Sequence, residues 1–232
     1  MCIRDRTPGA RTCVIGGYAL GQQDRDLTWA QVHDVYGGEG LKIGVLDYAV
    51  SYDFRCDNMN DGLKLLAPPN PNDGQYLVEG AYMTWIRDDA IEADNEFSGT
   101  IRDCLVDGYS NALSLNQSAS NASSVHIIED CIFIAAVMNN DHAADGAGHQ
   151  VLFKTVPAGQ VHMNNVKVGM YENPITPSRI MFRPSGTWTN VTYYLGPGWV
   201  GADPAVPQGV TVSRDWAGLL ADAAAWKTAH GY

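Results

Sequence analysis

Long apolar runs and positive charge are what this sequence has least of. No apolar run reaches the roughly 18–20 residues needed to span a bilayer, so we expect no membrane insertion. Only 15 Lys and Arg stand against 26 Asp and Glu, which gives a net charge of −11. This balance excludes the Lys/Arg-rich surfaces that bind nucleic acid or anionic membranes. An apolar content of 45% still suffices for a continuous core.

The cysteines lack the spacing of a metal site. Apart from Cys2, the chain contains Cys13, Cys56, Cys104 and Cys131, and none forms a C-x-x-C pair, so a zinc site is not expected. Cys104 and Cys131 occur in similar contexts, Arg-Asp-Cys-Leu-Val-Asp and Glu-Asp-Cys-Ile-Phe-Ile. This similarity favours free thiols stacked in a core over a disulfide framework.

The first six residues, Met-Cys-Ile-Arg-Asp-Arg, show no structural pattern. They resemble translated sequencing-adapter read-through, which occurs on metagenomic open reading frames. The start of the chain also lacks the basic, apolar and cleavage-site regions of a signal peptide. We therefore expect residues 1–6 to be a non-native leader that replaces the true start of the chain. We expect a secreted or cell-surface protein whose signal peptide was lost with that start.

One short pattern returns along the chain in the order polar, small, apolar, polar, apolar. Its central apolar residues are Leu41, Leu63, Ile91 and Leu113, at intervals of 22, 28 and 22 residues. The longer interval contains Ala-Pro-Pro-Asn-Pro-Asn-Asp (residues 67–73), which is typical of a surface loop. Alternation of this kind suits a strand with one narrow buried face, and such strands must stack to complete a core. The repeat predicts an all-β fold, a right-handed parallel β-helix.

We assign the β-helix to residues 7–200 and a linker with a capping helix to residues 201–232. Ser213 is the expected N-cap of this helix, which we expect to cover the open end of the solenoid. The expected buried face of the helix consists of Trp216, Leu219, Leu220, Ala223 and Trp226. An antiparallel β-sandwich is the alternative, but it requires turn signals every 8–12 residues or so, and the repeat lacks that spacing.

The polar position that opens each repeat predicts a column of side chains. Its members are Glu39, Asp61, Asp89, Asn111 and, after an insertion spanning residues 138–148, His149. Equivalent positions on stacked coils lie about 4.8 Å apart. Such a column forms either an acid–base site or a cation site, and bound Ca²⁺ remains an open alternative. The competing interpretation is that Asp and Asn simply terminate strands at turns.

Other residues near this column are candidates for contact with a ligand. Asp88 precedes Asp89, and Glu92 follows on the same repeat. Arg87 is placed to relieve the repulsion between these acids or to bind substrate. Tyr109 is a candidate for stacking on a sugar ring, as are Trp85, Tyr82 and Trp29, although such aromatics are more often core residues.

Two of these segments resemble a known family. Arg87-Asp88-Asp89-Ala90-Ile91 is similar to the Gly-Asp-Asp-Cys-Ile segment of polygalacturonases, and Asn60-Asp61-Gly62-Leu63 to their Asn-Thr-Asp-Gly-Ile segment. Over residues 11–200 the chain resembles the pectin-lyase-like superfamily of right-handed β-helices. The resemblance implies that Asp61, Asp88 and Asp89 are the catalytic carboxylates of an inverting glycoside hydrolase.

The chain departs from the polygalacturonase pattern at two places. Ser110-Asn111-Ala112 stands where the family has Gly-His-Gly, and a Gly148-His149 pair follows one coil later. Arg179-Ile180-Met181 lacks the lysine of the family's Arg-Ile-Lys. His149 therefore joins the three aspartates as a catalytic candidate, and Arg179 joins the substrate-binding candidates.

The sequence as a whole predicts a carbohydrate-active protein whose partner is a polysaccharide. The first hypothesis is a polysaccharide-degrading enzyme, either a glycoside hydrolase or a lyase, that uses the clustered aspartates. The alternative is a non-catalytic polysaccharide-binding or surface-adhesin β-helix.

Overall fold

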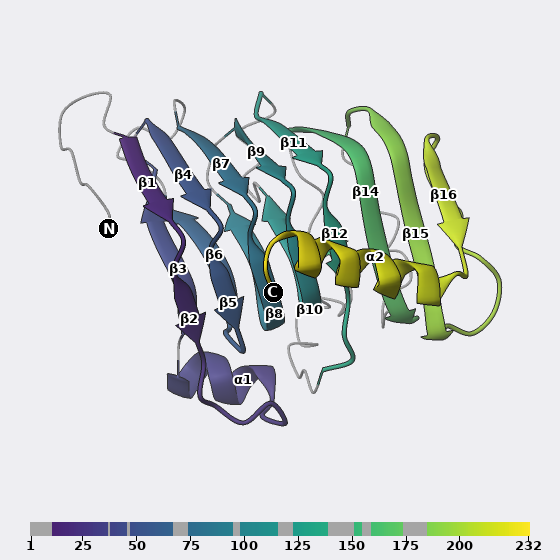
Figure 1. Ribbon diagram of the computed structural model, residues 1–232, viewed down its shortest axis with the longest axis horizontal. Helices are drawn as coiled ribbons and strands as arrows, with labels where there is room; N and C mark the ends of the chain where they lie inside the picture. The colour runs from purple at the N-terminus through teal and green to yellow at the C-terminus, as the bar shows by residue number, and fades with distance from the viewer. Residues whose placement is uncertain are drawn as a thin grey trace.

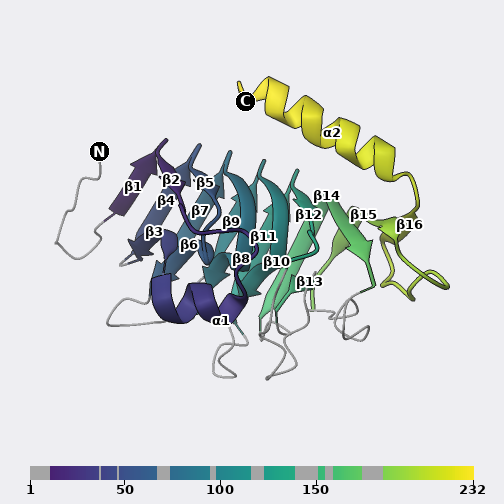
Figure 2. The same ribbon diagram turned by 90° about the horizontal axis from the view of Figure 1, so that it is seen from below.

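The computed structural model of the chain describes residues 11–36, 38–45, 47–66, 74–94, 98–115, 123–138, 151–154, 159–173 and 185–232. In this part of the chain, 16 strands form one sheet that winds into a right-handed parallel β-helix (Figures 1 and 2). All strand pairs among the described residues are parallel. The predicted fold class is therefore confirmed, and the antiparallel sandwich is wrong.

Each coil of the β-helix contributes strands to up to three faces. The first face contains β1 (Arg11–Ile15), β4 (Tyr48–Tyr52), β7 (Gln75–Glu79), β9 (Ser98–Arg102), β11 (Val125–Glu129) and the beginnings of β14 (Gln160–Glu172) and β15 (Trp188–Gly198). The second face contains β2 (Tyr18–Leu20), β5 (Arg55–Asp57), β12 (Ile132–Ile134), β16 (Val210–Ser213) and parts of β8 (Tyr82–Ala93), β10 (Leu105–Leu115), β14 and β15. The third face contains β3 (Glu39–Gly44), β6 (Asp61–Leu66), β13 (Val151–Phe153) and the ends of β8 and β10.

The strand register of the third face confirms most of the predicted stack. Leu63 pairs with both Leu41 and Ile91, and Ile91 pairs with Leu113. These side chains fill the interior because each coil repeats the same inward position. The predicted column Glu39, Asp61, Asp89 and Asn111 follows the same order, as the pairs Glu39–Asp61 and Asp89–Asn111 show.

The predicted register is wrong at the next coil. Asn111 pairs with Val151, and Leu113 pairs with Phe153, so the column continues two residues later than expected. The reason is that Val151-Leu152-Phe153 is uniformly apolar and fits the repeat in two registers, of which packing selects the one that stacks Phe153 on Leu113. His149 itself lies outside the described residues.

The corner between the first and second faces repeats a left-handed backbone conformation. The residue at this corner has φ between 49° and 68°, which glycine, asparagine and aspartate tolerate best. The corner residues are Gly16, Asp53, Gly80, Asp103, Asp130, Asn165 and Asn190. The side chain that follows the corner is buried in the core from Phe54 onward, as at Cys104 and Cys131. The prediction of stacked free thiols at these two cysteines is confirmed.

The C-terminal helix α2 (Trp216–Ala229) forms as predicted, but its position differs. It lies lengthwise along the outer side of the second face instead of covering an open end (Figures 1 and 2). Asp215, not Ser213, caps it, because Ser213 is the last residue of β16. Leu219, Ala223 and Trp226 are buried as predicted, whereas Leu220 is 45% exposed and the prediction for it is wrong.

Candidate acid–base site

The sequence-predicted acids lie on the outer side of the third face, where β6 and β8 pair. In each coil a small residue follows the polar position and points into the core, as Gly62 and Ala90 do. A Cβ on Gly62 would lie 2.6 Å from the Met83 sulfur, so only glycine fits there. The preceding side chains, Asp61 and Asp89, are thereby directed to the outer side. We call Asp61, Asp88, Asp89 and Glu92 the acid cluster.

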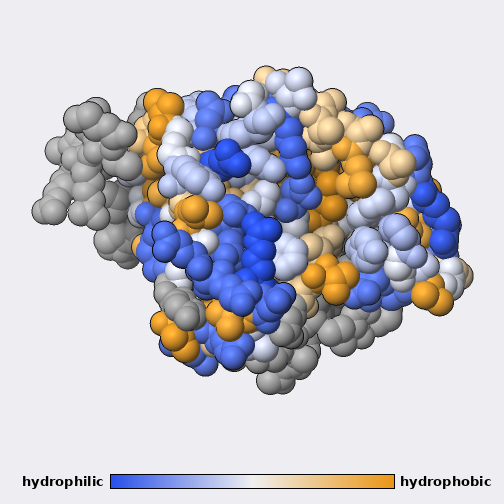
Figure 3. Space-filling view, turned by 60° about the horizontal axis from the view of Figure 1, so that its bottom comes forward, coloured by the Kyte–Doolittle hydropathy of each residue, from blue (hydrophilic) through white to orange (hydrophobic). Residues whose placement is uncertain are grey.

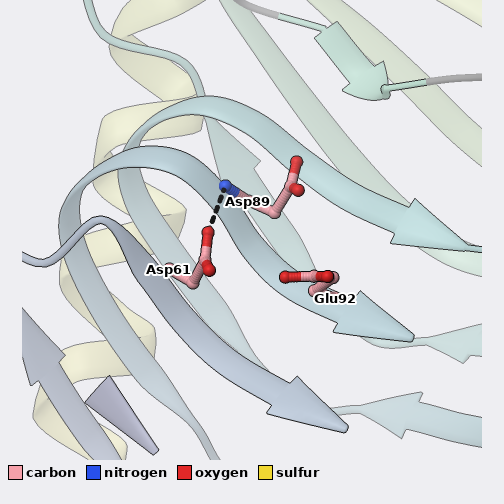
Figure 4. Close-up of side chains that lie close together, drawn as sticks. All are labelled: Asp61, Asp89 and Glu92. Atoms are coloured by element: carbon pink, nitrogen blue, oxygen red, sulfur yellow. Dashed lines mark hydrogen bonds between the residues drawn. The ribbon is translucent and has the colours of Figure 1, made fainter. Parts of the chain in front are cut away.

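Three members of the acid cluster come together from two adjacent coils. Asp61 on β6 and Asp89 and Glu92 on β8 each offer a carboxylate oxygen within 4.8 Å of the others (Figure 4). The backbone N–H of Asp89 donates to Oδ1 of Asp61 at 3.5 Å (Figure 4). This confirms that stacking brings the predicted acids side by side. Asp61 and Asp89 are only 5% and 1% exposed.

Asp88, the fourth member, is surrounded by hydrogen-bond donors. Its Oδ1 accepts from Lys154 Nζ at 3.1 Å and from Asn111 Nδ2 at 3.2 Å, and its Oδ2 accepts from Trp29 Nε1 at 3.0 Å. Lys154 also binds Asp89 at 2.8 Å. Three segments far apart in the sequence therefore donate hydrogen bonds to this carboxylate. Such a set of donors is typical of a charged acceptor and not of a residue that only ends a strand at a turn.

Trp29 reaches the acid cluster because a short helix begins there. Thr28 caps α1 (Trp29–Gln31) in a capping box with Gln31, and the chain continues as a π-helix, η1 (Val32–Tyr36). The cap fixes the direction of Trp29, whose ring stacks on His33 with centres 4.3 Å apart. The segment before β3 thus contributes a hydrogen-bond donor to the site.

Two lysines supply the positive charge. Lys64 binds Glu92 at 2.5 Å and Asp61 at 3.5 Å, and Lys154 bridges Asp88 and Asp89. Burial lowers the pKa of each ammonium group, but the neighbouring carboxylates outweigh it and raise the pKa of Lys64 and Lys154 above its ordinary value. Both lysines therefore remain protonated at neutral pH.

The same surroundings change the protonation of Asp61 and Asp89. Burial raises the pKa of Asp61 to about 7, the charges of Asp88 and Glu92 add to this, and Lys64 opposes it. Burial and the charge of Asp88 raise the pKa of Asp89 well above its usual range, against the effect of Lys154. At neutral pH a large fraction of Asp61 is consequently protonated, which is the property required of a general acid.

The acid cluster contains buried acceptors whose hydrogen-bonding capacity is not used. Among the described residues, Oδ1 of Asp89 and Oδ1 of Asn111 are buried and lack a partner. The three clustered carboxylates are also spaced like the oxygen ligands of a divalent cation. Lys64 already places a positive charge between Asp61 and Glu92 and so offsets part of the negative charge of the cluster.

The structure assigns different roles to two of the predicted substrate-binding residues. The Arg87 guanidinium donates to the carbonyls of Leu27 at 2.7 Å and Asp24 at 2.6 Å and to Oδ1 of Asn58 at 3.0 Å, so it fastens the segment before α1. Lys154 instead takes the charge-balancing role expected of Arg87. Tyr109 is fully buried in the core, because it occupies the inward position after the Gly108 bend, and the prediction of sugar contact is wrong for it.

The structure shows where some of the remaining candidate residues lie, and their substrate-binding roles stay predictions. Glu92 and Asn111 belong to the site, through Lys64 and Asp88 respectively. Arg179 and His149 lie outside the described residues. Sequence reasoning missed both site lysines. Lys64 was accessible to it, because it stands three residues after Asp61 in the repeat, whereas Lys154 requires the register across residues 139–150.

No protein-family model, curated protein or solved structure matched this chain. The described residues also contain no helix with the length and apolar character to cross a membrane. The function is therefore inferred from the geometry of the acid cluster.

Proposed function

We propose that this protein is a polysaccharide-degrading enzyme, a glycoside hydrolase of the pectin-lyase-like superfamily that acts outside the cell. The observation that carries the proposal is that Asp61 is buried beside Asp88 and Asp89 of the adjacent coil, and this burial raises the pKa of Asp61 to about 7. Glycoside hydrolysis requires this combination, a carboxylic acid that protonates the leaving oxygen and a carboxylate that acts from the other side. Asp61 is the proposed acid, and Asp88 is the proposed carboxylate.

The protonation of the lysines favours hydrolysis over elimination. A lyase removes a proton from the sugar with a neutral base, and a lysine can do so only if its pKa is lowered. The pKa values of Lys64 and Lys154 are raised instead, because both bind carboxylates. In the proposed enzyme these lysines keep the cluster compact and limit its negative charge.

The test compares the wild-type protein with Asp61→Asn on a panel of acidic and neutral polysaccharides. Products are measured as reducing ends and as the ultraviolet absorbance of unsaturated uronates, with and without chelator. We expect reducing ends without unsaturated products, and a loss of activity of about 10²- to 10⁴-fold in Asp61→Asn. Wild-type activity is expected to fall as the pH rises through about 7, because Asp61 then loses its proton.

The matched control is Asp222→Asn, which removes an acid on α2 that binds Lys167 away from the acid cluster. It is expected to retain wild-type activity. Unsaturated products, or full activity in Asp61→Asn, would contradict the proposal.

The burial of the acid cluster favours a second candidate, a non-catalytic polysaccharide-binding β-helix. Asp61, Asp88 and Asp89 are all less than 10% exposed, and a buried acid network can serve structure alone. This candidate predicts saturable glycan binding without any product, and binding that Asp61→Asn leaves unchanged.

A further inference from the structure

A second cluster lies on the outer side of the second face and consists of one arginine among tyrosine rings. Arg55 stands between Tyr18 and Tyr82 in the strand register. Its guanidinium carbon lies 5.0 Å from the ring centre of Tyr18 and 5.4 Å from that of Tyr82. Tyr232, which follows α2, adds a third ring at 5.2 Å. All three distances fall within the roughly 6 Å range of cation–π attraction. We call these four residues the Arg55 cluster.

Among the described residues Arg55 has no acidic partner, unlike other arginines on the surface. Arg25, Arg102 and Arg214 each bind a carboxylate at 2.7–2.9 Å. For Arg55, no carboxylate oxygen of the described residues lies within 4.0 Å of a guanidinium nitrogen. Asp53 acts electrostatically on Tyr232 but makes no ion pair with Arg55. Ring contacts thus hold the guanidinium of Arg55 in place, and no carboxylate of the described residues occupies its N–H donors.

The Arg55 cluster is accessible from solvent. Arg55 is exposed, and Tyr18 and Tyr232 are 55% and 39% exposed, whereas Tyr82 is buried. Lys227 lies 5.3 Å from the centre of the Tyr82 ring, but its ammonium group already binds the carboxylate of Asp107. The chain as a whole is strongly acidic, with a net charge of −11. On the side of the molecule shown in Figure 3, hydrophobic residues form separate groups among hydrophilic ones, which does not favour a broad apolar interface there.

We propose that the Arg55 cluster binds a sugar that carries a carboxylate, that is, a uronic acid residue of a polysaccharide. A guanidinium presents paired N–H donors that match the two oxygens of a carboxylate. The exposed tyrosine rings offer flat apolar surfaces beside it, which match the C–H face of a sugar ring. A neutral sugar lacks the charge, and a small inorganic anion lacks the ring, so the combination selects an acidic sugar. This site is separate from the acid cluster and does not rest on the proposed hydrolysis.

The test measures binding of a uronic acid trimer by calorimetry and compares it with a neutral glucose trimer and with inorganic phosphate. Binding is measured in the wild-type chain and in Asp61→Asn, so that failure of the hydrolysis proposal leaves this result readable. We expect saturable binding of the uronic acid trimer that is at least tenfold tighter than binding of either other probe. Arg55→Gln is expected to weaken it at least tenfold, and Arg55→Lys to weaken it less, because lysine keeps the charge but not the paired donors.

Arg214→Gln is the matched control, since it removes an exposed arginine that already binds Asp203. It is expected to leave the affinity unchanged. Should Arg55→Gln fail to fold, Tyr18→Ala removes an exposed ring of the same cluster and is expected to weaken binding as well. The proposal is overturned if the uronic acid trimer does not bind, if the neutral trimer or phosphate binds equally well, or if neither variant changes the affinity. A variant that loses only thermal stability would identify Arg55 as an anchor for the C-terminal segment, which also overturns it.

Discussion

At the scale of single residues, burial inside the β-helix shifts the pKa of acids and of histidine in opposite directions, and in both cases it favours the neutral form. Asp61 is buried among other acids, so its neutral form is favoured and its pKa rises to about 7. His126 is buried in the core, where its Nδ1 lies 2.8 Å from the hydroxyl of Tyr76. Its neutral form is also favoured, and its pKa falls to about 4. Near neutral pH the buried histidine is therefore uncharged, and a large fraction of the Asp61 side chains is protonated.

His126 predicts a loss of stability in acid. The folded protein binds this proton less tightly than the unfolded chain, so stability is complete above about pH 6.5 and falls as the pH decreases toward 4. The shift corresponds to about 3 kcal/mol in the free energy of unfolding at the lower limit. In His126→Gln, which cannot be protonated, this part of the pH dependence is expected to disappear. Urea unfolding at several pH values measures it, and an unchanged pH profile would contradict the assignment.

At the scale of elements, side chains on the first face pack across more than one coil. Tyr76, Gly99 and His126 occupy the same inward position on β7, β9 and β11. A Cβ on Gly99 would overlap the ring of Tyr76. The absence of a side chain at Gly99 lets the Tyr76 ring lie over the next coil, so that its hydroxyl reaches His126 two coils away. A glycine within a strand here serves close packing.

Gly99→Ala is expected to lower the free energy of unfolding by about 1–3 kcal/mol, because the new methyl group displaces the Tyr76 ring from its place. Gly44→Ala is the matched control, since Gly44 also lies in a strand but nothing lies within 4 Å of its Cβ position. The control is expected to change stability by no more than about 0.5 kcal/mol. Chemical denaturation measures both variants, and equal stabilities would show that the core accommodates the methyl group.

The sequence predicted these elements only where residue type repeats together with position. The third-face stack of Leu41, Leu63 and Ile91 was readable because the same chemistry returns at each coil. The corner of the first face was not recognised as one feature, since Gly, Asp and Asn share only their tolerance of a left-handed backbone. The register across residues 139–150 was misassigned, so Lys154 was missed as a site residue.

At the scale of the whole molecule, α2 links coils whose strands do not pair directly with each other. A solenoid is held together mainly by contacts between neighbouring coils. Trp226 Nε1 donates to Asp103 at 2.7 Å at the corner before β10, while Lys167 on β14 binds Asp222 at 2.6 Å. Leu219 packs against Gly169, also on β14. The sequence predicted the helix but not this position, because its buried face fits an outer wall as well as an open end.

Trp226→Ala is expected to destabilise the protein by about 3–5 kcal/mol, because it empties the apolar contact between α2 and the second face and leaves Asp103 without that donor. Leu220→Ala, an exposed position on the same helix, is expected to cost less than about 1 kcal/mol. Thermal and urea unfolding of both variants provide the comparison. A small effect of Trp226→Ala would mean that α2 contributes little to the stability of the coils.

The claim that Asp61 is a carboxylic acid near neutral pH is tested most directly by carbon-13 NMR of the aspartate side-chain carboxyl groups, with Asp61→Asn used to assign the signal. The account predicts a carboxyl signal that titrates near pH 7, because burial and the charges of Asp88 and Glu92 hold the proton. A signal that titrates near pH 4, as for an exposed aspartate, would contradict both the electrostatics of the acid cluster and the assignment of Asp61 as the acid.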